Sequence, residues 1–412
     1  MKRYLVYSLC SLSMLAVHLL APTSMRVHAA SPTYSVDVQS AAVPGFISDG
    51  DILTPNGAGN FSPPNVLIPQ PLIGFFPTPN SAELDALSYG TEPMLMNGPL
   101  VQHRWTFSVD EFAVGRPGAP GPSVTTEGAY GNQQAAADIY STTLGAGPVA
   151  PSLGVNIGLF DGDGGFTLPF ASQGLNLREP NPPTVNGQDA GDNLDAWDLD
   201  QQVSQGVVGA PFNVPIYYSL DSAFIDPLDF PNNTGTAQGN GFVGGDVLVS
   251  YSAGGPTNVF AQAFQLGLDH NGPDTDDLDA LVLWENGDGL FSPSTAPYSW
   301  LNGLDDMLLF SVRRGSAVIG QFDSLQGLPI EEGDILMPPT VPGGLPGIFV
   351  TAESLGLATF RTNGTADTFQ GHGDELDALD VQQTQVPEPG TLGMGALALL
   401  RMLVRRKRTA GL

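Results

Sequence analysis

Short apolar stretches, separated by glycine, proline and aspartate, follow one another along most of this chain. In stretches such as Leu278-Asp279-Ala280-Leu281, the side chains alternate between two faces, and a period of two is typical of a β-strand. The chain has 51 glycines and 36 prolines, and these two residue types interrupt helices. The pattern therefore predicts an all-β fold built from short strands.

Four sequence features recur in the same order four times, so the chain contains four tandem β-repeat units. Each unit has an aromatic-Ser-aliphatic strand, a short Asp-apolar strand, a ten-residue block and a final Leu-Asp-Ala sequence. Loops rich in glycine and proline separate these features, and the longest are expected near 113–134 and 143–165. The units span about residues 33–90, 104–200, 216–286 and 307–382, within a repeat domain over 30–385.

The ten-residue block aligns without gaps in all four units. Its ninth position is always glycine or asparagine, the residue types that tolerate a positive φ angle. We therefore expect a left-handed backbone at this position, although small residues could also occur there by chance in a loop. The four residues are Gly74, Asn176, Gly267 and Gly356.

The Leu-Asp-Ala sequence places its leucine and alanine on one face of a strand and its aspartate on the other. An alanine in every copy indicates that a neighbouring strand approaches closely, as it would near the axis of a ring of strands. The presence of the aspartate in every unit favours a structural role. These aspartates are Asp85, Asp195, Asp279 and Asp377.

A unit of about four short strands cannot bury its apolar face alone, so neighbouring units must pack against one another. The simplest closed arrangement is a four-bladed β-propeller with one blade per unit, and this is the fold that the repeats predict. An open array of β-units or packed sandwiches is the alternative. No strand is visibly shared between the first and the last unit, which counts against a closed ring.

The charge of the chain is strongly acidic, with 42 aspartates and glutamates in all. Such a surface repels nucleic acid and attracts divalent cations and basic partners, although solubility or life in salty water would also explain it. Between residues 31 and 386 there is no lysine, and the only basic residues other than histidine are Arg104, Arg116, Arg178, Arg313, Arg314 and Arg361.

Several aspartate-rich loops have oxygen ligands at alternating positions, which suits a hard cation such as calcium. No loop matches the twelve-residue EF-hand pattern. Asp374 and Glu375 are further candidate calcium ligands on the same grounds. The alternative is that each aspartate accepts hydrogen bonds from backbone amides of a turn. Calcium is the only cofactor expected, with Asp161, Asp163, Asp189, Asp192, Asp269, Asn271, Asp274 and Asp276 as its candidate ligands.

Catalytic motifs are absent from the sequence, which has no Gly-x-Ser-x-Gly motif and no P-loop. His103, His270 and His372 do not have the spacing of zinc ligands. Paired carboxylates such as Glu83 and Asp85 occur in every unit, whereas the carboxylate pair of a glycosidase occurs once. The sequence therefore predicts no enzymatic activity.

The first 29 residues have the organisation of a secretory signal peptide. Lys2 and Arg3 form the basic region, residues 4–21 are largely apolar, and residues 27–29 supply a small-residue cleavage site. Cys10, the only cysteine, lies inside this segment, so the exported chain is expected to have no disulfide.

The C-terminal segment 386–412 combines a Val-Pro-Glu-Pro sequence, a short apolar stretch and a basic cluster, in that order. It resembles the PEP-CTERM sorting signal of exported bacterial proteins. The apolar stretch of 15 residues, interrupted by Arg401, is shorter than the about 20 residues of a membrane-spanning helix. An ordinary C-terminal anchor helix is the alternative. The residues that carry the resemblance are Val386, Pro387, Glu388, Pro389, Arg405, Arg406, Lys407 and Arg408.

The resemblance implies that an exosortase-type sorting enzyme recognises the tail at the membrane and that the protein reaches the cell surface or beyond. It also implies a setting in surface polymer and biofilm matrix. We therefore expect an exported β-repeat protein with a structural or adhesive role. The alternative is a carbohydrate-binding or carbohydrate-active propeller that contacts surface polysaccharide, in which the side chains stacking on sugars would be Trp105, Trp197, Trp284 and Trp300.

Overall fold

A computed structural model describes most of the repeat domain, and Ser31–Gln382 form one compact unit. The predicted signal peptide and sorting tail, with all eight residues of the sorting signal, lie outside the described residues. Within the described residues, no helix is both long enough and apolar enough to span a membrane. The described residues are 32–37, 40, 47–56, 62–75, 83–89, 104–110, 113, 115–119, 121–128, 134–143, 154–164, 173–179, 192–199, 215–221, 236–251, 255–269, 276–363 and 373–381.

The described residues form seventeen strands in four sheets, and the fold is a four-bladed β-propeller, as the repeats predicted. The first blade contains β17 (Leu379–Val381), β1 (Pro32–Tyr34), β2 (Ile52–Thr54) and β3 (Asn65–Ile68). The second contains β4 (Ala86–Ser88), β5 (Arg104–Ser108), β6 (Ile139–Thr143), β7 (Asn156–Asp161) and β8 (Gln173–Gly174). The third contains β9 (Ala196–Leu199), β10 (Ile216–Ser219), β11 (Val247–Ser250) and β12 (Asn258–Ala261). The fourth contains β13 (Leu278–Trp284), β14 (Met307–Val312), β15 (Ile335–Met337) and β16 (Gly347–Val350).

Helices are short and lie in the connections between strands. The described residues form eight helices, and none of these helices is longer than five residues. They are η1 (Gln70–Leu72), α2 (Val124–Glu127), η2 (Ala135–Ala137), α3 (Thr236–Asn240), α4 (Ala263–Leu266), η3 (Ser299–Asn302), α5 (Ala352–Leu355) and α6 (Phe360–Asn363).

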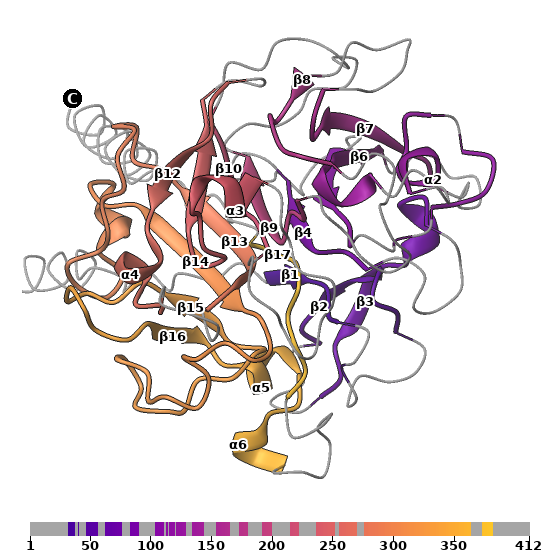
Figure 1. The fold of residues 1–412 in the computed structure, drawn as a ribbon. Helices are drawn as coiled ribbons and strands as arrows, with labels where there is room; N and C mark the ends of the chain where they lie inside the picture. Colours follow the sequence, from indigo (N-terminus) through magenta and orange to yellow (C-terminus); the bar gives the residue numbers. More distant parts are fainter. Residues whose placement is uncertain are drawn as a thin grey trace, which may run out of the picture. The chain divides into compact units, whose positions relative to one another are not determined.

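The innermost strand of each blade contacts the innermost strands of its two neighbours. β4 contacts β9, β9 contacts β13, β13 contacts β17, and β17 contacts β4, so these four strands surround the axis (Figure 1). All four begin at or just after a Leu-Asp-Ala sequence. The close approach that the repeated alanines indicated is therefore present.

The ring is closed by the last strand, which corrects the expectation that no strand is shared between the first and last units. β17 pairs antiparallel with β1, with Thr33 opposite Asp380. The reason is that the blades are offset from the sequence units by one strand, because each Leu-Asp-Ala strand becomes the innermost strand of the next blade. The Leu-Asp-Ala strand of the last unit, β17, therefore joins the sheet of the first blade.

Four serines join each blade to the next. The serine of each aromatic-Ser-aliphatic strand donates its hydroxyl to the carbonyl oxygen of the leucine in the Leu-Asp-Ala sequence of the same unit. Because of the offset, that leucine belongs to the neighbouring blade. The four pairs are Ser35 with Leu84 (2.7 Å), Ser108 with Leu194 (2.8 Å), Ser219 with Leu278 (3.3 Å) and Ser311 with Leu376 (2.8 Å).

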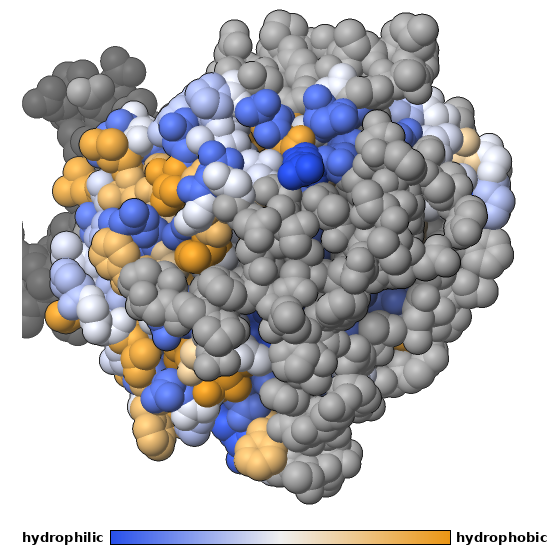
Figure 2. All heavy atoms as spheres, viewed as in Figure 1, coloured by the Kyte–Doolittle hydropathy of each residue, from blue (hydrophilic) through white to orange (hydrophobic). Residues whose placement is uncertain are grey.

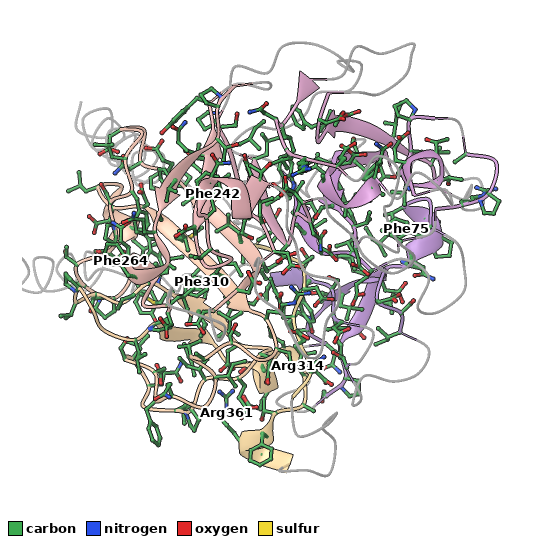
Figure 3. The ribbon with its side chains drawn as sticks, in the orientation of Figure 1. Phe75, Phe242, Phe264, Phe310, Arg314 and Arg361 are labelled. Atoms are coloured by element: carbon green, nitrogen blue, oxygen red, sulfur yellow. The ribbon has the colours of Figure 1, made fainter. Side chains whose placement is uncertain are left out.

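The hydrophobic core is divided into four clusters, and each combines side chains from two adjacent blades. Tyr217 of the third blade and Phe310 of the fourth, for example, belong to one cluster, and both are fully buried. Another cluster contains Phe75, which Figure 3 labels at the edge of the second blade, and Phe107 of β5. Burial between blades is the main term that holds the ring together.

The ninth residue of each ten-residue block has the left-handed backbone that the repeats predicted. The four positions expected to be left-handed have φ angles of 95° at Gly74, 65° at Asn176, 84° at Gly267 and 94° at Gly356. At Gly356 a side chain would also collide with the chain, because a Cβ would lie 2.2 Å from the carbonyl oxygen of Ser62. The close contact and the positive φ together require glycine there.

The aspartate of the Asp-apolar strand binds the outer turn of its own blade in three of the four units. Asp334 accepts the amide of Glu331 at 3.0 Å and that of Ala352, the first residue of α5, at 2.9 Å. Asp51 and Asp246 accept the two equivalent amides in their blades.

The second blade departs from the repeat pattern. The segment 143–165 was expected to be a long loop, but it contains the strand β7, which pairs with β6. A fifth strand, β8, then pairs parallel to β7. The expected loop at 113–134 contains the short helix α2, which covers Val124–Glu127. The insertion thus forms an extra outer strand.

Candidate functional site

Acidic side chains gather at one end of the propeller axis. An aspartate lies close to the start of each innermost strand, and the second strand of each blade ends at the same side, because adjacent strands are antiparallel. The residue after the aromatic-Ser-aliphatic strand is acidic in three units and arginine in the fourth. We call the resulting group the axial acidic cluster, and it comprises Asp37, Glu83, Asp85, Asp110, Asp195, Asp221, Asp277, Asp279, Glu375 and Asp377.

Two arginines from the end of β14 oppose this charge. The Nη1 atom of Arg313 lies 3.9 Å from Asp195 and 3.7 Å from Asp277, and it also pairs with Asp221. The Nη1 atom of Arg314 lies 2.5 Å from Asp37 and 3.1 Å from Glu375. Figure 3 shows Arg314 inside the fold.

Burial dominates the electrostatics of the cluster. It raises the pKa of Asp85, Asp195, Asp279 and Asp377 well above the usual range, and the neighbouring carboxylates raise each pKa further. Burial also raises the pKa of Glu375 to about 7, against the opposing effect of Arg314. Ionised carboxylates are therefore costly here unless a cation lies beside them.

Four oxygen atoms at equivalent repeat positions in the cluster have no hydrogen-bond partner among the described residues. They are the Oδ2 atoms of the four Leu-Asp-Ala aspartates, whose residues are only 5 to 9% exposed. A purely structural aspartate, such as Asp334, has both oxygens bonded to protein groups. The sequence indicated a structural role for Asp85, Asp195, Asp279 and Asp377, and the unsatisfied oxygens are the feature that sequence reasoning missed.

Three groups of three carboxylates each bring one oxygen per residue within 4.8 Å, close enough to share a metal ion. Two belong to the axial acidic cluster, namely Asp195 with Asp221 and Asp277, and Asp279 with Glu375 and Asp377. The third lies in the second blade and consists of Asp138, Asp161 and Glu179. The groups differ in which protein donors already bind them.

The third group mainly holds a turn. Asp138 accepts the amide of Gly162 at 2.9 Å, Asp161 accepts that of Gly164 at 2.6 Å, and Glu179 accepts that of Asp163 at 3.1 Å. Asp161 was an expected calcium ligand and belongs to this group, whereas the carboxylate of Asp163, its expected partner, does not.

Comparisons with protein-family models, with curated proteins and with solved structures found no match. The function of this chain must therefore be inferred from its own geometry.

The other expected calcium ligands that the structure describes belong to none of these three groups. Asp192 accepts the amides of Arg178 and Thr236, and Asp276 accepts those of Asp269 and Val318 at 2.6 and 2.8 Å. These aspartates therefore hold loops together, which was the alternative reading of the loop pattern. Asp189, Asn271 and Asp274 lie outside the described residues, as do the three histidines at positions 103, 270 and 372.

The tryptophans that could stack on sugars are mostly buried. Trp105 is 5% exposed, Trp197 is fully buried and Trp300 is 7% exposed, which leaves only Trp284 with intermediate exposure. Tyr298 is 41% exposed, and its ring meets Trp300 edge-on at 5.4 Å. Tyr298 also has a positive φ angle of 62°, which is uncommon for an aromatic residue.

Proposed function

We propose that this protein is an exported cell-surface or extracellular-matrix β-propeller with a structural or adhesive role and no enzymatic activity. The observation that supports this function best is the closed ring of four equivalent joints, in which a serine hydroxyl of one blade binds a leucine carbonyl of the next. The acidic residues at the axis recur from blade to blade in the same way. Repetition of this kind suits a scaffold better than a single reaction centre.

The adhesive part of the proposal rests on exposed apolar side chains of the fourth blade. Leu290, Leu301 and Leu304 lie between β13 and β14 and are 69, 65 and 76% exposed, and Val341 between β15 and β16 is 65% exposed. Both connections lie at the end of the blade opposite the axial acidic cluster, because the strands are antiparallel. On the face drawn in Figure 2, apolar and polar side chains are interspersed around this part of the molecule. Exposed apolar residues are typical of interaction surfaces.

An adhesion assay tests this role. Attachment of the full chain to its host's surface polymer should fall when Leu301 and Leu304 are both changed to Ser, because the exposed apolar area is lost. Val155→Ser is the matched control, since Val155 is 47% exposed on the second blade. Equal attachment of all three proteins would refute an adhesive role for this surface.

Export and sorting are proposed from the two ends of the sequence. When the full chain is produced with an exosortase-type enzyme, we expect it at the cell surface or in the medium. Changing Pro387, Glu388 and Pro389 to Ala should leave it in the inner-membrane fraction. If fractionation finds the variant and the natural chain in the same place, the sorting proposal is wrong.

A carbohydrate-binding function is the second candidate, and the half-exposed Tyr298 beside Trp300 favours it. A glycan array with the full chain would reveal saturable binding to one class of sugar. Loss of that binding in Tyr298→Ser, with the fold retained, would support this alternative and identify surface polysaccharide as the partner.

A further inference from the structure

The spacing of Asp279, Glu375 and Asp377 suits a large divalent cation. One oxygen from each lies within 4.8 Å of the others. Oxygen atoms that bind the same calcium ion at about 2.3–2.6 Å lie at most about 5 Å apart. The three residues come from the starts of β13 and β17, the innermost strands of two adjacent blades. The backbone of the ring therefore fixes their positions.

The two axial groups differ in how the protein neutralises them. In the group of Asp195, Asp221 and Asp277, Arg313 lies against all three carboxylates, so a guanidinium occupies the place of a cation. In the group of Asp279, Glu375 and Asp377, Arg314 contacts only the glutamate. Every carboxylate of the first group therefore forms an ion pair with an arginine, whereas in the second group only Glu375 does.

Two unsatisfied oxygens of the second group belong to carboxylates that form no ion pair with an arginine. The Oδ2 atoms of Asp279 and Asp377 have no hydrogen-bond partner, and each residue is 8% exposed. A buried carboxylate oxygen without a donor is costly, and a bound cation or a proton removes the cost. Asp85 and Asp195, whose Oδ2 atoms also have no hydrogen-bond partner, belong to the same cluster and add further negative charge around the position.

We propose that Asp279, Glu375 and Asp377 bind one calcium ion at the axis and that this ion joins the fourth blade to the first. All ligands are carboxylate oxygens, the donors that calcium prefers, and none is histidine or cysteine. Magnesium binds oxygen at about 2.0–2.1 Å and needs a smaller site, so it should bind more weakly. This inference does not depend on the adhesive or the carbohydrate-binding role.

The test uses the purified full chain with calcium, with magnesium and with the chelator EGTA. Calcium should raise the melting temperature in proportion to the logarithm of its concentration, and magnesium should raise it less. Asp279→Asn and Asp377→Asn should each weaken calcium binding about 10-fold or more in calorimetry. In EGTA both variants should be at least as stable as the natural protein, because each removes one buried negative charge.

Asp246→Asn is the matched control, since Asp246 is a buried aspartate that binds the amides of Val243 and Ala263. It should be less stable in both solutions and keep the full calcium shift. A natural protein with no calcium shift and no heat of binding would overturn the proposal. So would a calcium shift that survives unchanged in Asp279→Asn and Asp377→Asn, because the ion would then bind elsewhere.

Discussion

The serine joints between blades predict a specific loss of stability when one hydroxyl is removed. Ser311 is fully buried and donates to the carbonyl oxygen of Leu376 at 2.8 Å, across the joint between the fourth and first blades. Ser311→Ala leaves that carbonyl without this donor, and an unsatisfied buried group costs about 1–3 kcal/mol. The substitution removes only one atom, so the cavity term is small. We therefore expect the free energy of unfolding to fall by about 1–3 kcal/mol.

The four joints should differ in a predictable order. Ser35→Ala should cost the most, because its hydroxyl donates to Leu84 at 2.7 Å and also accepts the amide of Ala378 at 3.0 Å. Ser219→Ala should cost the least, because its hydrogen bond is 3.3 Å long and therefore weaker.

Urea denaturation of the full chain in EGTA, followed by tryptophan fluorescence, measures these losses. Ser141→Ala is the matched control, because Ser141 lies in β6, is 1% exposed and has a hydroxyl without a hydrogen-bond partner. It should leave stability unchanged or raise it. The reasoning is refuted if Ser311→Ala costs no more than Ser141→Ala, or if Ser219→Ala costs more than Ser35→Ala.

Arg361→Met should lower the free energy of unfolding by about 3–5 kcal/mol in urea titrations, because Arg361 binds both oxygens of Asp334, at 2.5 and 2.6 Å, and the substitution leaves that carboxylate unpaired. Gly356→Ala should lower the melting temperature more than Gly320→Ala. Both glycines have positive φ angles, 94° and 80°, but a Cβ collides with the backbone only at the first. Burial raises the pKa of Asp198 to about 6, so the folded state holds its proton more tightly than the unfolded state, whose pKa is about 3.9. The stability of the natural protein relative to Asp198→Asn should therefore be highest below pH about 4, fall by up to about 3 kcal/mol as the pH rises through about 6, and stay constant above it. A flat difference between the two proteins would contradict this.

Local conformation could be predicted from the sequence because single residues determine it. The left-handed positions follow from steric limits on φ that only glycine and asparagine escape readily, and these limits hold in any fold. All four positions, Gly74, Asn176, Gly267 and Gly356, have the expected sign of φ. The all-β class and the propeller likewise follow from a repeat that cannot bury its own apolar face.

Strand pairing could not be predicted in the same way, because it depends on which chain segments meet in space. Ser35 and Leu84 belong to one sequence unit, yet they lie in different blades. The shared hydrogen bond explains why both recur together in every unit. The same offset hides the closure of the ring, since β17 resembles every other Leu-Asp-Ala strand until it is seen beside β1.

Two of the three residues in the candidate calcium site, Asp279 and Asp377, were missed for a related reason. In the sequence alone, each Leu-Asp-Ala aspartate resembles a structural residue. Its Oδ2 atom becomes buried without a hydrogen-bond donor only when the four blades pack around the axis. One signal was nevertheless present in the sequence. The position after the aromatic-Ser-aliphatic strand is Asp37, Asp110 and Asp221 in three units but Arg313 in the fourth. A charge reversal at one repeat position indicates that these residues face one another.

This charge reversal also explains why the four blades share one strand arrangement but differ in the charged side chains near the axis. Arg313 and Arg314 follow the same strand of one blade, so the ion pairs that they form lie at the two joints on either side of that blade. Arg313 forms ion pairs with all three carboxylates of the group on the third-blade side. Arg314 divides its contacts between Asp37 and Glu375, so it leaves the Oδ2 atoms of Asp279 and Asp377 without a partner. The uneven distribution of arginine around a regularly repeated scaffold therefore leaves one group of carboxylates in which two of the three form no ion pair with an arginine, and this is where we propose that calcium binds.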